Sequence, residues 1–91
     1  MKKRILVVDD EIGALKLIGI MLERGGFTVV EARDAHAALS VLENTVPDLI
    51  ILDVMMPGMN GIDLCKVIRQ REVTQKTPVL ILSARGDAES I

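Results

Sequence analysis

The chain has 91 residues, 49% of them hydrophobic, so it forms one small folded domain at most and is too apolar for a disordered segment. Thirteen acidic and eleven basic side chains give a net charge of −2, which provides no electrostatic surface for nucleic acid or an acidic membrane. Phe27 is the single aromatic residue, which disfavours stacking on bases. We therefore expect no direct nucleic-acid contact.

Cysteine content and hydropathy both indicate a cytoplasmic protein. Cys65 is the only cysteine in the sequence, so it cannot form an internal disulfide and fits a reducing compartment. No stretch approaches the roughly 20 apolar residues that a membrane-spanning helix needs. The apolar run at 5–8 is too short for a signal peptide, and acidic residues end it at once. We expect no membrane contact.

Strand and helix patterns alternate from the start of the chain. Four branched apolar residues at 5–8 predict a strand that is buried on both faces. Apolar residues then recur at helical spacing, with Asp10 placed to cap this helix and Gly25 or Gly26 to end it. The predicted apolar face of the helix is Ile12, Leu15, Ile18, Gly19 and Leu22.

The second strand and helix are shorter. Phe27, Val29 and Val30 predict a strand, and Asp34 is placed to open a helix that ends before Pro47. One face of this helix is apolar and comprises Ala35, Ala38, Leu39 and Leu42.

The third strand ends in a carboxylate. Residues 49–52 predict a strand with no solvated face, so Asp53 is expected where the strand emerges from the sheet. A turn rich in Pro, Gly and Asn follows, and a third helix is expected to start near Gly61. Its predicted inward residues are Ile62, Cys65 and Ile68. Residues 79–82 predict a fourth buried strand, and Asp87 is placed to cap a fourth helix.

This alternation predicts the α/β class with right-handed βαβ units and a doubly wound parallel sheet. The expected strand order is 2-1-3-4, as in flavodoxin-like folds, with helices on both faces. The chain then reverses direction between the first and third strands, which opens a crevice at their carboxyl ends. Asp9, Asp10 and Asp53 are expected to point into that crevice.

Three neighbouring carboxylates repel one another, and a bound divalent cation is the simplest compensation. Oxygen ligands without His or Cys suit Mg²⁺, and the carbonyl of Met55 is placed to complete the protein's share. Such a site suits phosphoryl transfer, in which a carboxylate attacks phosphorus and forms an aspartyl phosphate. The Ser83 hydroxyl and the Ala84 backbone N–H, after the neighbouring strand, are expected to donate to phosphoryl oxygens.

Five motif segments follow one another at regular spacing: ILVVDDE at 5–11, GFTV at 26–29, PDLIILD at 47–53, MMPGMNG at 55–61 and LSAR at 82–85. On these segments the sequence resembles, over its whole length, the receiver domain of bacterial two-component response regulators. The resemblance implies that Asp53 accepts a phosphoryl group from a histidine kinase or phosphotransfer protein. It also implies that Asp9 and Asp10 hold Mg²⁺ and that Ser83 is the switch hydroxyl.

The family pattern continues with most of a fourth helix, a fifth strand and a fifth helix, which this sequence lacks. The missing strand carries a lysine beside the acceptor and a switch aromatic, and neither Lys76 nor Phe27 is placed to replace them. We therefore expect residues 1–91 to form a C-terminally truncated receiver (CheY-like). The strand at 79–82 would be an exposed edge, which predicts a homo-oligomer or a domain swap through it.

Three functions compete at this stage. The first is a signalling receiver, with no catalysis beyond its own phosphorylation and dephosphorylation. The second is a truncated or degenerate receiver that acts only as an interaction or oligomerisation module. The third is a phosphatase of the haloacid-dehalogenase type, which has an Asp-x-Asp pattern that this chain does not match. Plainer roles also remain: Asp10 as a helix cap, Ser83 as the end of a strand and Cys65 as a core residue.

Overall fold

The computed structural model describes residues 2–82 and 88–90. Its longest helix, α1, has 13 residues, and no helix in this part of the chain is long and apolar enough to cross a bilayer. The elements are β1 (Arg4–Val8), α1 (Ile12–Arg24), β2 (Thr28–Ala32), α2 (Ala35–Asn44), β3 (Leu49–Asp53), α3 (Gly61–Gln70), the 3₁₀ turn η1 (Glu72–Thr74), β4 (Val79–Leu82) and β5 (Ala88–Ser90).

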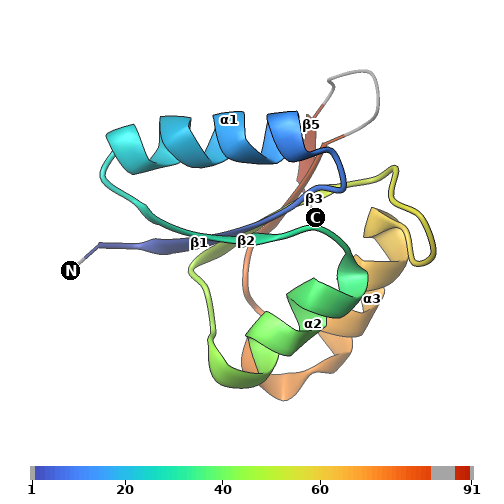
Figure 1. The fold of residues 1–91 in the computed structure, drawn as a ribbon. Coiled ribbons are helices and arrows are strands. Elements are labelled where there is room, and N and C mark those ends of the chain that lie inside the picture. The colour runs from blue at the N-terminus through green and yellow to red at the C-terminus, as the bar shows by residue number, and fades with distance from the viewer. Residues whose placement is uncertain (1, 83–87, 91) are drawn as a thin grey trace.

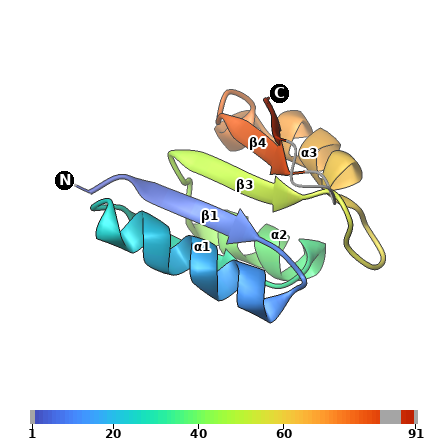
Figure 2. The ribbon, with the colours of Figure 1, turned by 90° about the horizontal axis from the view of Figure 1, so that it is seen from above.

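The strands form one sheet in the order β2-β1-β3-β4-β5, and the first four are parallel. Figure 1 shows α1 on one face of this sheet and α2 with α3 on the other. The arrows of β1, β3 and β4 lie side by side and point the same way (Figure 2). The doubly wound α/β fold with order 2-1-3-4 is therefore confirmed.

The pleat divides the apolar side chains between two cores. Leu6, Val8, Ile50 and Leu52 are at most 1% exposed and pack with residues of α2 and α3. Their neighbours Ile5, Val7 and Ile51 pack with Leu15 of α1 on the opposite face. Because β1 and β3 are covered on both sides, their near-continuous apolar sequences are the expected ones for central parallel strands.

Two helices begin as their sequences predict, and one does not. The side chains of Asp34 and Asn60 cap α2 and α3 by accepting the backbone N–H groups of Ala37 and Asp63. The prediction that Asp10 caps α1 is wrong, because Glu11 is the capping residue and makes no side-chain cap bond. The N–H of Glu11 is instead bound by the carboxylate of Asp9.

Two residues assigned to inward faces are substantially exposed. Ile12 is 49% exposed and Ile62 is 37% exposed. Each lies in the first turn of its helix, and the buried stripe of large side chains starts two or three residues later, at Leu15 and Leu64. The periodicity was therefore right, while the stripe starts later than predicted.

The C-terminal segment also differs from the prediction. Residues 80–82 of β4 pair with β5 in antiparallel register, Leu82 opposite Ala88. The prediction of an exposed edge at β4 is therefore wrong over these residues. The exposed edge was the reason to expect self-association through β4, and that reason no longer applies to residues 80–82. A helix after Asp87 is wrong as well, since Ala88–Ser90 is a strand; Asp87 itself lies outside the described residues.

Two leucines on helices provide a matched test of the core. Leu64 is fully buried in α3, whereas Leu17 of α1 is 60% exposed. We predict that Leu64→Ala lowers the free energy of unfolding by about 3 kcal/mol, because it removes buried methyl groups and leaves a cavity. Leu17→Ala should change it by less than about 0.5 kcal/mol. Urea denaturation followed by circular dichroism measures both, and equal losses would contradict the packing described.

Candidate functional site

The candidate site lies at the carboxyl ends of β1 and β3, which are adjacent strands. Val8 is in register with Leu52, so Asp9 and Asp53 follow paired positions on the two strands. The backbone N–H of Asp9 donates to the carbonyl of Ala32 at 3.1 Å, which ties the end of β1 to β2 as well. Pairing of the sheet thereby brings together two carboxylates that lie 44 positions apart in the sequence.

Asp9, Asp10 and Asp53 form one cluster of carboxylates. One oxygen from each of the three lies within 4.8 Å of those of the other two. Asp9 is 8% exposed, Asp53 is partly buried and Asp10 is exposed, so the cluster opens to solvent on one side. The predicted convergence of these three residues is confirmed in its geometry.

Backbone N–H groups orient two of the carboxylates. The N–H of Glu11 donates to Oδ1 of Asp9 at 2.9 Å, and the N–H of Met55 donates to Oδ1 of Asp53 at 3.3 Å. Each bond spans two residues and turns the chain immediately after the aspartate, as Asx turns do. The chain segments that leave β1 and β3 therefore hold their own acidic side chains in place.

The pKa of the Asp53 carboxyl is raised above its ordinary value. Partial burial is the main cause, and the negative charges of Asp9 and Asp10 add to it; the N–H of Met55 acts in the opposite direction. A carboxylate in this position is thus destabilised by its surroundings. A cation held between the three groups would relieve that repulsion, so the donor set fits a hard divalent ion such as Mg²⁺.

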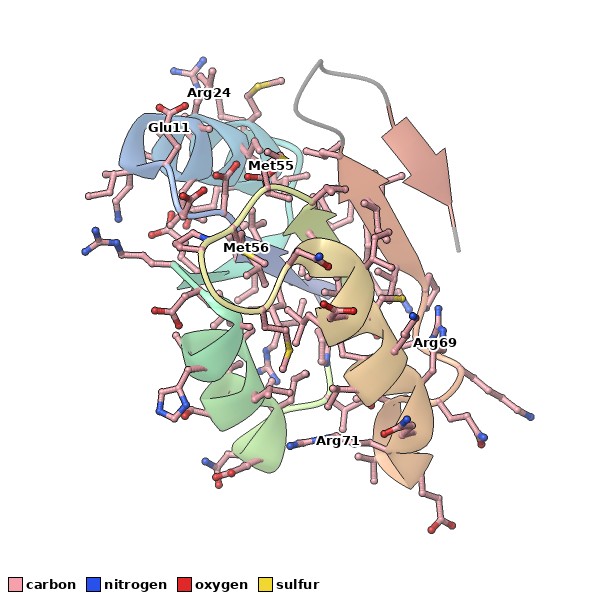
Figure 3. All side chains as sticks on the ribbon, turned by 90° about the vertical axis from the view of Figure 1, so that its right-hand side faces the viewer. Glu11, Arg24, Met55, Met56, Arg69 and Arg71 are labelled. Carbon is pink, nitrogen blue, oxygen red and sulfur yellow. The ribbon has the colours of Figure 1, made fainter. Side chains whose placement is uncertain are left out.

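The loop from β3 to α3 borders the cluster. Figure 3 labels Met55 and Met56 on this loop; Met55 is 62% exposed, whereas Met56 is 7% exposed and belongs to the core. The carbonyl of Val54 accepts the N–H groups of Met56 and Gly61, which closes the loop at its base. The sequence suggested a turn here and gave no signal for these two bonds.

The remaining predicted site residues are placed as follows. Ser83 and Ala84 lie outside the described residues. Cys65 is buried, as expected, and His36 is exposed. Phe27 packs in the core beneath α1.

A model of the family described as "Response regulator receiver domain" matches residues 5–91. The chain belongs to this family. Related curated proteins include the alkaline phosphatase synthesis transcriptional regulatory protein PhoP of Bacillus subtilis, 45% identical over 96% of this chain. The phosphate regulon transcriptional regulatory protein PhoB of Escherichia coli is 43% identical over 98% of it. The chain spans 35% and 39% of the length of these two proteins.

Solved receiver structures share the fold. A response regulator from Chloroflexus aurantiacus superposes with a TM-score of 0.90 at 34% identity, covering 96% of this chain and 71% of that one. The response regulator TrrA of Thermotoga maritima, solved in complex with Mg²⁺-BeF, gives a TM-score of 0.84 at 34% identity. That match covers 92% of this chain and 70% of TrrA. This receiver domain is therefore a signalling domain of two-component systems.

The raised pKa of Asp53 makes stability depend on pH. The folded receiver favours the protonated carboxyl, so Asp53 stabilises the fold most at pH values below its unfolded pKa. That contribution is lost as pH rises through the raised folded pKa. Asn cannot ionise, so we predict that Asp53→Asn is more stable than the wild type at pH 7 without divalent ions. The difference should shrink at acidic pH; thermal unfolding from pH 3 to 8 measures it, and a constant difference would contradict the assignment.

Proposed function

We propose that this receiver is a phosphoacceptor whose nucleophile is the Asp53 carboxylate. The donor would be a phosphohistidine on a histidine kinase or phosphotransfer protein. The observation that carries the proposal is the convergence of the Asp9, Asp10 and Asp53 oxygens within 4.8 Å at the ends of adjacent strands. The open side of the cluster leaves room for a donor to approach Asp53, which is only partly buried.

In the proposed transfer, a carboxylate oxygen of Asp53 attacks phosphorus in line and an acyl phosphate forms. The P–N bond of the phosphohistidine breaks, and its electron pair stays on the imidazole nitrogen, which takes up a proton from water. The N–H of Met55 orients the Asp53 carboxylate during the attack. The neighbouring charges of Asp9 and Asp10 destabilise the free Asp53 carboxylate. The phosphoryl group brings further negative charge to the site, which a bound cation would offset.

We assign the cation site to the carboxylates of Asp9, Asp10 and Asp53, with the carbonyl of Met55 as a fourth ligand. When bound, Mg²⁺ would neutralise the negative charge that gathers as the phosphoryl group approaches. The Mg²⁺-BeF complex of TrrA, a protein with the same fold, supports this assignment. Asp9 is the most buried of the three carboxylates, and it also accepts the Glu11 N–H.

We also propose that the Ser83 hydroxyl and the Ala84 N–H bind phosphoryl oxygens. The support is sequence position: Ser83 directly follows Leu82, and Leu82 is in register with Asp53 on the adjacent strand. The hydroxyl is the group that would respond to phosphorylation and make the domain a switch.

Phosphorylation of the purified domain tests the proposal directly. With Mg²⁺ and acetyl phosphate, we predict a mass increase of one phosphoryl group, because a small donor needs no partner surface. Asp53→Asn should abolish this mass increase. Asp63 is an exposed aspartate on α3, so the control variant Asp63→Asn should keep the mass increase. Mass spectrometry after borohydride reduction locates the acyl phosphate. If the wild type gains no mass with a fresh donor, the receiver acts as an interaction module and the phosphoacceptor proposal is wrong.

Magnesium binding provides a separate test. We predict that Asp9→Asn and Asp10→Asn weaken Mg²⁺ binding by more than the roughly 10–100-fold that loss of an outer-shell partner costs. Asn at position 9 can still accept the Glu11 N–H, so the turn is preserved. Isothermal titration calorimetry gives the dissociation constants. For the wild type, Mg²⁺ at ten times its Kd should add about 1.4 kcal/mol to the free energy of unfolding; an equal gain in both variants would refute the assignment.

A further inference from the structure

Gly61, the first residue of α3, packs directly against the backbone of the acceptor aspartate. A Cβ atom placed on Gly61 would lie 2.4 Å from the carbonyl oxygen of Asp53, 3.0 Å from its carbonyl carbon and 3.0 Å from Cα of Val54. These are all backbone atoms, so no side chain can rotate away to make room. Any other L-residue at this position must displace either the start of α3 or the end of β3.

Glycine is required at position 61 because of the close contact with the Asp53 peptide. The backbone dihedral angles of Gly61 are ones that any residue can adopt. The glycines with positive φ in the described part of the chain are Gly26 and Gly58, and Gly61 is a regular helical residue. Gly58 is the opposite case within the same loop. Its φ of 77° disfavours side chains, while a Cβ there would meet no atom within 4 Å.

The end of β3 is also fixed on its other side, so it cannot yield freely. The N–H of Val54 donates to the carbonyl of Leu82 in β4 at 3.0 Å, and the N–H of Gly61 donates to the carbonyl of Val54 at 3.1 Å. The Asp53–Val54 peptide is thus held between β4 and the first turn of α3. A side chain at Gly61 would press on the carbonyl of Asp53 itself, and any displacement of this peptide would carry the Asp53 carboxylate with it, relative to Asp9 at the end of β1.

We propose that Gly61 is a positioning residue for phosphoryl transfer: its missing side chain lets α3 seat against the Asp53 peptide and sets the distance from the Asp53 carboxylate to Asp9 and Asp10. The inference rests on the proposed phosphoacceptor function. It assigns to Gly61 an effect on the reaction and on cation affinity, in addition to any effect on stability.

Gly61→Ala and Gly58→Ala form a matched pair in the same loop. Both should lower the melting temperature, the first through the clash and the second through backbone conformation. Only Gly61→Ala should weaken Mg²⁺ binding, as measured by calorimetry. Only Gly61→Ala should also slow labelling by acetyl phosphate, by about a hundredfold, because a misplacement of about 1 Å costs that much in rate. All three proteins are compared in sucrose, which favours the compact state, so that a destabilised variant is measured folded.

Each outcome of this comparison decides a different point. If the wild type is not labelled, the phosphoacceptor proposal fails, and the Mg²⁺ affinities of the two variants still test Gly61. If the wild type is labelled and Gly61→Ala matches it in rate and affinity, the positioning role is wrong. If both variants lose rate and affinity equally, the loop as a whole is responsible, and the specific role of Gly61 is also wrong.

Discussion

The parallel pairing of β1 with β3 is the constraint on which the site depends. In this register Val8 lies opposite Leu52, so the next residue of each strand is an aspartate at the same edge of the sheet. A shift of one residue would turn every side chain of one strand to the other face, so each would have to fit the other of the two cores. The apolar side chains of both strands are divided between two packed cores, and this packing opposes such a shift. The hydrophobic core thereby determines where the carboxylates meet.

The cluster opposes the stability that the core provides. Burial and two like charges raise the pKa of Asp53, so its ionised carboxylate is unfavourable in this site. The surrounding backbone resists relaxation, because the N–H groups of Glu11 and Met55 hold Asp9 and Asp53 in place. A domain that keeps such repulsion has a reason to bind a cation. Titratable groups whose pKa is shifted in this way are typical of functional sites.

The sequence predicted the class, the strand order and the convergence of three aspartates, since these follow from apolar runs and from the rule that parallel strands end at one edge. It could not predict which residue caps α1, because Asp10 and the observed Glu11 are adjacent and the choice depends on the bond from Glu11 to Asp9. It also missed β5, whose three residues carry no strand pattern and are defined by pairing with β4. The sequence could not predict the contact of Gly61 with Asp53 either, because a glycine after a turn can reflect the turn's conformation or a close backbone contact.

The bond between the Glu11 N–H and the Asp9 carboxylate has a mechanical consequence. That N–H belongs to the N-cap residue of α1, and the carboxylate belongs to the proposed ion site. A cation bound at the site would compete with this N–H for the same carboxylate. With 13 residues, α1 is a lever about 20 Å long, so a tilt of about 5° at Glu11 would move its far end by about 2 Å. Occupancy of the site would in this way be connected to the position of Arg24, at the far end of α1.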